Sequence, residues 1–115
     1  MNKQKPTKQI NMSLLGYITG SNKRNLIKNL IDEGSEIIDI RDSKDYLKGH
    51  VPGARNIPQH LILSRADDLK KNNTPVILYG AKKDDAKEIT ELLKDKGVAA
   101  VNGGNLQKMQ AMAIG

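Results

Sequence analysis

The sequence predicts a single α/β domain in which a mainly parallel sheet is covered by helices on both faces. Apolar runs typical of buried strands alternate along the chain with segments whose apolar residues recur at helical spacing. The strongest strand is expected at Pro75–Tyr79, an apolar run suited to the middle of a parallel sheet. With 115 residues, the chain is long enough to bury a core without metal or disulfide cross-links.

The first elements follow from capping and spacing signals. Ser21 is the expected N-cap of a helix that Gly34 ends. Apolar residues at helical spacing support this helix: Leu26, Ile27, Leu30 and Ile31. A short buried strand is expected over residues 36–40, and a helical turn over 43–48 is ended by glycine.

The middle of the chain is punctuated by a turn at Val51–Gly53. Pro52 fixes its own φ and Gly53 tolerates a positive φ, so the chain reverses there. We expect a brief strand over residues 54–57 and a short helix over 61–69.

A second long helix is expected to follow the strongest strand. Asp84 or Asp85 is its predicted cap, and Gly97 is its end. Its inner stripe consists of Ile89, Leu92 and Leu93.

The C-terminal part is expected to hold a strand over 98–101, a turn at Gly103–Gly104 and a final helix over 106–112. Residues 1–16, rich in lysine, are expected to form a flexible arm preceding a domain over 17–115.

Composition limits the classes of function. The net charge of +6 can attract anionic partners, but three tyrosines, no Phe and no Trp leave few platforms for base stacking, so nucleic-acid binding ranks last. His50 and His60 are too isolated for a metal site, and neither a metal nor another cofactor is expected. No segment is long and apolar enough to span a membrane, so we expect a cytoplasmic protein.

A segment over residues 39–58 carries a dense set of typed positions. They are Asp39, Arg41, Asp45, Tyr46, Gly49, His50, Val51, Pro52, Gly53 and Ala54. This set resembles the first signature of the rhodanese-like sulfurtransferase family, an Asp-x-Arg followed by an acidic residue, an aromatic residue and Gly-His-Ile-Pro-Gly-Ala. The resemblance implies a three-layer α/β/α sandwich with a mainly parallel central sheet.

Most of this segment is expected to be structural. Asp39 and Arg41 follow a strand at one edge of the sheet, where buried charges need partners, and we expect Arg41 to pair with Asp45. His50 is expected to donate a hydrogen bond to a backbone carbonyl rather than to act as a catalytic base.

The loop after the strongest strand departs from the family. Family loops read Cys-Arg-x-Gly-x-Arg-Ser or similar, and the cysteine carries the sulfur. In this chain Gly80 occupies the cysteine position, Asp85 the later arginine position and Ala86 the serine position, and the whole sequence lacks cysteine. Persulfide chemistry needs a thiolate, so the resemblance implies a noncatalytic domain.

We therefore expect a regulatory module that binds a protein partner or a small anion such as thiosulfate or phosphate. The expected site is the loop Gly80, Ala81, Lys82, Lys83, Asp84, Asp85 and Ala86. The lysines attract anions, whereas the two aspartates oppose them at the start of a helix. The alternative is a sulfurtransferase relative whose cysteine was replaced by divergence or by engineering; the concurrent loss of arginine and serine favours divergence.

The C-terminal end matches the family less closely. Rhodanese-like domains often end in Gly-Gly, a short spacer and a tryptophan. Here the pair Gly103–Gly104 is present and the tryptophan is not, so Met109 or Leu106 is expected to fill the same apolar gap.

Overall fold

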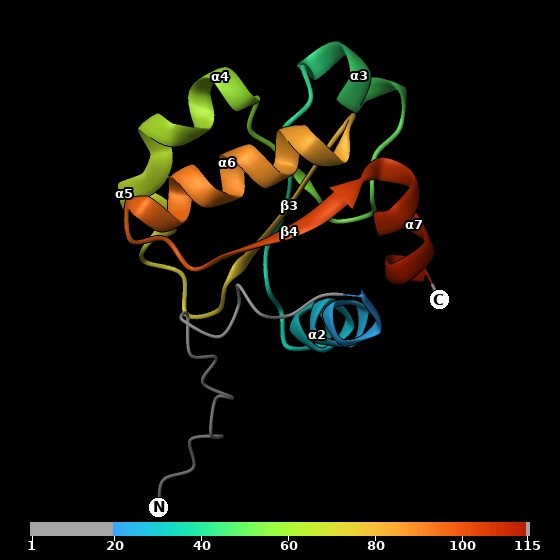
Figure 1. Ribbon diagram of the computed structural model, residues 1–115. Helices are drawn as coiled ribbons and strands as arrows, with labels where there is room; N and C mark the ends of the chain where they lie inside the picture. The colour runs from blue at the N-terminus through green and yellow to red at the C-terminus, as the bar shows by residue number, and fades with distance from the viewer. Residues whose placement is uncertain (1–19, 115) are drawn as a thin grey trace, which may run out of the picture.

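The computed structural model describes residues 20–114 and is built around a four-stranded sheet (Figure 1). The strands lie in the order β2-β1-β3-β4, and every pair of neighbours is parallel. Their bounds are Ile37–Asp39 for β1, Arg55–Asn56 for β2, Val76–Gly80 for β3 and Ala100–Asn105 for β4. The apolar run predicted as the strongest strand is the fully buried β3, in the interior of the sheet.

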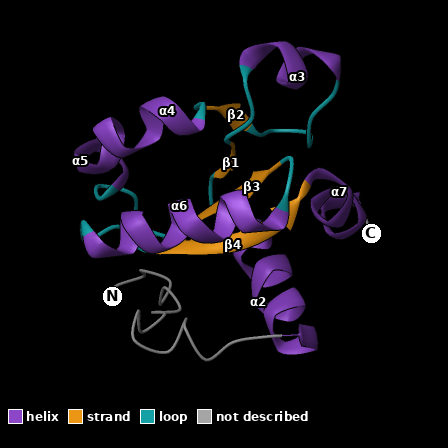
Figure 2. Ribbon diagram, turned by 45° about the horizontal axis from the view of Figure 1, so that its top comes forward, coloured by secondary structure: helices purple, strands orange, loops and turns teal. Residues whose placement is uncertain are grey.

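Helices cover both faces of this sheet. Figure 2 shows α6 across one face, and α2 and α7 beside the other. The bounds are Gly20–Asp32 for α2, Ser43–Lys48 for α3, Gln59–Ile62 for α4, Ala66–Leu69 for α5, Lys83–Asp95 for α6 and Leu106–Ile114 for α7, with a 3₁₀ turn, η1, at Leu63–Arg65.

The two faces bury separate hydrophobic cores, because successive strand side chains point to opposite sides. Ile38 and Leu78 pack with α4, α5 and α6, whereas Ile37 and Ile77 pack with α2 and α7. This arrangement confirms the predicted α/β/α sandwich with a parallel central sheet.

Three boundary predictions were wrong. Ser21 lies inside α2 and is not its N-cap. The N-cap of α6 is Lys82, with no side-chain hydrogen bond, so Asp84 and Asp85 lie in the first helical turn and do not cap it. At that position they still favour the helix electrostatically, because carboxylates stabilise the positive end of the helix dipole.

The third error concerns Gly103–Gly104, which lies within β4 rather than in a turn. A Cβ on Gly103 would lie 2.6 Å from the Met109 sulfur and 3.0 Å from the Leu78 carbonyl oxygen. Glycine is therefore favoured in this strand because the backbone of β3 and Met109 of α7 both lie close to it. Met109 is fully buried and Leu106 partly buried in the core on the α2 and α7 side, as the sequence predicted for the apolar gap.

Two predictions concern other parts of the chain. The predicted arm, residues 1–16, lies outside the described residues. Among residues 20–114, no helix is long and apolar enough to cross a membrane.

Candidate functional site

The signature segment and the loop after β3 meet at the carboxyl ends of the parallel strands. Asp39 is the last residue of β1 and Gly80 the last of β3, and these two strands are hydrogen-bonded neighbours. In open α/β sheets this edge is where ligands usually bind. The topology therefore places both predicted segments at one end of the molecule.

Asp39 is the centre of a buried polar network at this edge. Its side chain is fully buried, and each carboxylate oxygen accepts more than one hydrogen bond. Oδ1 accepts from the Arg41 backbone N–H (2.9 Å) and Nε (3.0 Å), and Oδ2 accepts from Arg41 Nη2 and the Tyr79 hydroxyl (both 2.7 Å). A buried carboxylate is tolerated because its oxygens are satisfied in this way.

The predicted pairing of Arg41 with Asp45 was wrong, because Arg41 forms its ion pair with Asp39, the last residue of β1. Arg41 also donates from Nη2 to the Gly49 carbonyl at 2.7 Å and lies 5.9 Å from the centre of the Tyr79 ring. The side-chain hydrogen bond to Asp39 raises the pKa of the Arg41 guanidinium. Arg41 therefore ties the strand end to the C-terminal cap of α3 and has little freedom to reach a ligand.

Tyr79 joins the network from β3. Its hydroxyl donates to Asp39 and accepts from the Val51 backbone N–H at 3.1 Å. Burial, the largest cause, raises the pKa of the Tyr79 hydroxyl well above its usual range, so the group stays protonated. Sequence reasoning found this strand but not the role of its tyrosine, because a tyrosine in an apolar run has no signal for its partner.

His50 makes a hydrogen bond to a backbone carbonyl, the contact that the sequence predicted. Its Nδ1 lies 2.9 Å from the Tyr46 carbonyl oxygen, which can only accept, so Nδ1 carries the proton. The His50 and Tyr46 rings are stacked with centroids 3.7 Å apart, and the Tyr46 hydroxyl donates to the Ala54 carbonyl at 2.6 Å. These contacts fix the Gly-His-Val-Pro-Gly turn on α3.

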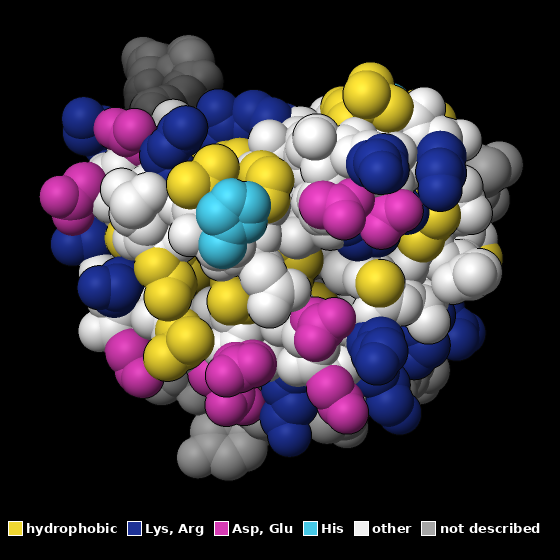
Figure 3. All heavy atoms as spheres, turned by 90° about the horizontal axis from the view of Figure 1, so that it is seen from above, with side chains coloured by type: hydrophobic (Ala, Val, Ile, Leu, Met, Phe, Trp, Pro, Cys, Tyr) yellow, Lys and Arg dark blue, Asp and Glu magenta, His cyan; other side chains and the backbone are white. Residues whose placement is uncertain are grey.

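The loop from Gly80 to Ala86 differs from the signature segment. Ala81, Lys82, Lys83 and Asp84 are exposed, whereas Gly80 and Ala86 are buried. The loop closes with a hydrogen bond from the Asp85 N–H to the Lys82 carbonyl at 3.1 Å. From above, the end of the molecule that carries α3 and α4 shows acidic and basic side chains intermixed (Figure 3).

The comparisons with known proteins agree with this geometry. The family model for the rhodanese-like domain matches residues 23–107. The chain belongs to the rhodanese-like domain family. The match covers the signature segment, the loop after β3 and the glycine pair of β4.

Solved structures of rhodanese-like domains resemble this one. The Rhodanese_3-like domain of the Alr3790 protein from Anabaena sp. is 27% identical, with a TM-score of 0.58 over 69% of this chain and 93% of that one. The E. coli structure described as "rhodanese with anions" is 28% identical, with a TM-score of 0.59 over 65% and 91% of the two chains.

A curated relative, the putative sulfur carrier protein YrkF of Bacillus subtilis, is 36% identical over 47 residues. This match covers 41% of the rhodanese-like chain and a quarter of the length of that relative.

The space around Gly80, where this rhodanese-like domain departs from its family, is narrow. A Cβ built there would lie 3.3 Å from Ile40 Cγ1 and 3.4 Å from Asp85 Cβ. A small side chain therefore fits only if Ile40 yields by a few tenths of an ångström. The close contact identifies the Ile40 side chain as a wall of the position that the family gives to its nucleophile.

Sequence reasoning missed a basic hollow of about 510 Å³ between α2, β4 and α7. It is lined by basic residues of α2 and α7, among them Lys23 and Lys108, and by Asn102 of β4. Only Lys83 belongs both to this hollow and to the predicted loop. The sequence shows the basic residues of α2, but it gives no signal for which residues of α7 face them.

Proposed function

We propose that this rhodanese-like domain does not transfer sulfur and that it serves as a noncatalytic module for an anionic group, free or carried by a protein partner. One observation carries the proposal: the 115 residues contain no cysteine, and Gly80 occupies the position of the family nucleophile. A regulatory role and a location in the cytoplasm remain predictions.

The chemistry of sulfur transfer explains why the lack of a cysteine sulfur excludes this activity. Sulfur transfer in this family requires a thiolate that attacks the donor and then holds the sulfur as a persulfide. The four methionines are thioethers with no proton to lose, so they cannot form this intermediate. Ser64, a hydroxyl of the described region, donates to the Leu61 carbonyl at 2.6 Å and lies outside the loop.

Binding of an anion at the loop is supported by its exposed lysines. Lys82 and Lys83 lie at the start of α6, where backbone N–H groups and the helix dipole favour negative charge. Asp84 and Asp85 oppose this preference, so the affinity is expected to be weak. The E. coli relative described with anions supports the same kind of ligand.

The test is an assay of sulfur transfer from thiosulfate to cyanide. We expect no turnover above a buffer blank for the natural chain, and no sulfur bound to the denatured protein after incubation with a labelled sulfane donor. Turnover above the blank, or label that survives denaturation, would show that the domain transfers sulfur by other means.

The alternative, a sulfurtransferase that has lost only its cysteine, is separated by Gly80→Cys with Gly80→Ser as the matched control. The two side chains are similar in size, and both must displace Ile40 slightly. We expect Gly80→Cys to remain close to the Gly80→Ser background, because Asp85 and Ala86 replace the family's arginine and serine. Robust transfer by Gly80→Cys alone would establish that the rest of the loop is intact and favour the alternative.

A further inference from the structure

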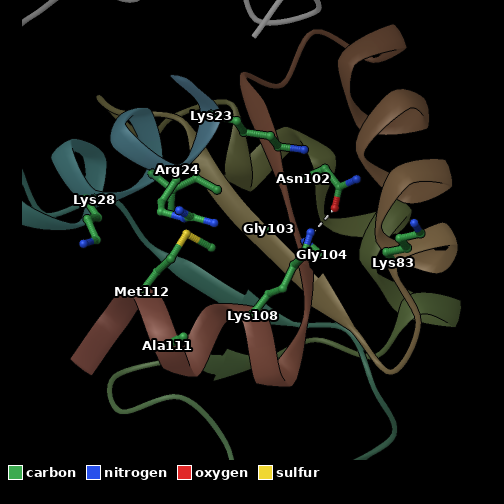
Figure 4. A pocket seen from close by; sticks show the side chains of 11 residues that line it. Lys23, Arg24, Lys28, Lys83, Asn102, Gly103, Gly104, Lys108, Ala111 and Met112 are labelled. Atoms are coloured by element: carbon green, nitrogen blue, oxygen red, sulfur yellow. Dashed lines mark hydrogen bonds between the residues drawn. The ribbon is translucent and has the colours of Figure 1, made fainter. Parts of the chain in front are cut away.

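The hollow between α2, β4 and α7 is unusual in the sign of its charges. Among the residues that the structure describes, the hollow has five basic lining residues and no acidic one: Lys23, Arg24, Lys28, Lys83 and Lys108. In the close view of Figure 4, Lys23 extends from α2 toward Asn102 of β4, and Arg24 lies beside Met112. Lys108 rises from α7, and Lys83 lies on the far side of β4. The charges thus come from three helices that surround one strand end.

These cations are not neutralised within the described part of the chain. The ion pairs of residues 20–114 involve other basic residues, namely Arg41, Arg55, Lys70 and Lys71. Burial, followed by repulsion from Lys108 and Lys94, lowers the pKa of Lys23. A half-buried lysine that lies among like charges without an internal partner is expected to face an external anion.

The neutral polar group at the hollow is also oriented as a donor. Asn102 Oδ1 accepts a hydrogen bond from the Gly104 N–H at 2.8 Å, so Nδ2 and its two protons are the part of the amide left for other partners. The side-chain polar groups that line the hollow can therefore all donate hydrogen bonds to a ligand.

The backbone of β4 places one of these cations directly. Gly104 has φ +88°, and a Cβ there would lie 3.1 Å from Lys108 Cδ. The aliphatic stem of Lys108 therefore lies against the bare glycine. A side chain at position 104 would be strained by the backbone and would also displace this lysine.

The size and walls of the hollow limit what can fill it. A volume of about 510 Å³ is within the range of small-molecule sites. Ile27, Ala111 and Met112 add an apolar wall beside the cations. Within residues 20–114, no aromatic side chain lines the hollow, so this part of the chain offers no stacking platform of the kind that single-stranded nucleic acids use.

We propose that this hollow is a binding site for a small organic phosphate with at least two negative charges, with its phosphate groups between Lys23, Arg24 and Lys108 and its neutral body on the apolar wall. The site is distinct from the centre of the Gly80–Ala86 loop and shares only Lys83 with it. Arginine and lysine donors from separate helices suit a group with several acceptor oxygens.

The first measurement is calorimetric titration of the intact chain with four probes at low salt: inorganic pyrophosphate, inorganic phosphate, phenyl phosphate and sulfate. We expect pyrophosphate to bind more tightly than sulfate because it carries more charge, and phenyl phosphate to bind more tightly than inorganic phosphate because of its ring. Indistinguishable affinities for all four probes, or no saturable binding, would overturn the proposal.

Substitutions then locate the site. Lys108→Met and Lys23→Met remove the charge and keep most of the aliphatic stem. Each should raise the Kd for pyrophosphate about tenfold, a change of ~1.4 kcal/mol in binding free energy. Lys23→Arg, which keeps the charge, should bind like the natural chain. Lys44→Met, at an exposed lysine of α3, makes the same change in net charge away from the hollow and should change the affinity little.

Lys82→Met separates this site from the loop, because Lys82 is exposed in the loop and does not line the hollow. If Lys82→Met weakens binding and Lys108→Met does not, the anion binds at the loop, and the present proposal fails while the proposed function stands. Equal weakening by Lys44→Met would indicate nonspecific attraction and would also overturn the proposal.

Competition identifies the class of ligand. An oligonucleotide or an acidic peptide that binds more tightly than pyrophosphate through Lys23 and Lys108 would show that the hollow serves a macromolecule instead, against the proposal. Thermal unfolding of each variant checks that the substitutions leave the fold intact.

Discussion

The charges of the Asp39 network are paired with one another, whereas those of the basic hollow are not. Asp39 and Arg41 form an ion pair whose side chains are 0% and 10% exposed and whose hydrogen bonds end on groups of the same chain. In the hollow, Lys23 and Lys108 repel each other and have no anionic partner among residues 20–114. Charges that neutralise one another hold a loop in place, whereas unneutralised charges of one sign are available to a ligand.

The most direct test of this difference is to remove Asp39, the shared acceptor of the neutralised network. Asp39→Ala would leave the Arg41 guanidinium and the Tyr79 hydroxyl without their shared acceptor. Removing one partner of a buried pair typically costs about 3–5 kcal/mol, because the other charge stays buried. We expect a loss of this order in the free energy of unfolding, measured by urea denaturation, or a chain that does not fold.

Asp45→Asn is the control for Asp39→Ala. Asp45 is the carboxylate that the sequence suggested for Arg41, whereas the guanidinium hydrogen-bonds to Asp39 and to the Gly49 carbonyl. We expect a change of less than about 0.5 kcal/mol, as is usual for surface charges. A larger loss for Asp45→Asn than for Asp39→Ala would mean that the arginine pairs differently in solution.

Tyr79→Phe should have a smaller effect on the same network. The substitution removes the donor to Asp39 Oδ2 and leaves the buried Val51 N–H without an acceptor, while Arg41 still holds the carboxylate. An unsatisfied buried donor costs about 1–3 kcal/mol. Urea denaturation at pH 8 should show a loss in this range, and a neutral result would mean that water replaces the hydroxyl.

The same variant gives a pH signature. Because the pKa of Tyr79 is raised in the folded chain, the unfolded chain releases the proton first once the pH rises above about 10. The stability that Tyr79 contributes is therefore fully present below pH 10 and declines above it. The stability difference between the natural chain and Tyr79→Phe should shrink between pH 9 and pH 11; a constant difference would contradict the raised pKa.

Much of this fold follows from local signals, and the exceptions are long-range contacts. The apolar run of β3, the helix α3 and the glycine that ends it were predictable because each depends on residues close in sequence. The strand position of Gly103 was not, because its reason is Met109 packing across the strand.

The candidate sites show the same limit. The loop of Gly80 was found from a resemblance, and the departure there is visible in the sequence alone. The partner of Arg41 was misjudged because Asp39 and Asp45 are both near in sequence, and only the backbone direction decides between them. The hollow requires Lys23 and Lys108 to face each other, which depends on how α2 and α7 pack.

The smallest expected change in stability comes from removing an unpaired cation of the hollow, and it tests the contrast with the paired charges of the Asp39 network. Lys23→Met removes a half-buried, unpaired cation that is repelled by Lys108, so we expect no loss of stability and a gain of up to about 0.5 kcal/mol. Lys44→Met is the control and should leave stability unchanged. A loss of more than about 1 kcal/mol in the free energy of unfolding would show that Lys23 has favourable partners. The charges of the hollow would then stabilise the fold, as those of the Asp39 network do.

The pH dependence of this gain has a defined sign. The folded pKa of Lys23 lies below its ordinary value, so as the pH rises through the folded pKa toward 10.5 the folded chain releases the proton first and the natural chain becomes relatively more stable. The advantage of Lys23→Met should therefore be largest near neutral pH and shrink in alkaline solution. Added salt should shrink it as well, because it screens the repulsion between the lysines. An advantage that grows with pH would contradict the lowered pKa of Lys23, which burial and then repulsion cause. An advantage that grows with salt would contradict the repulsion, and thermal unfolding at two pH values and two salt concentrations distinguishes the cases.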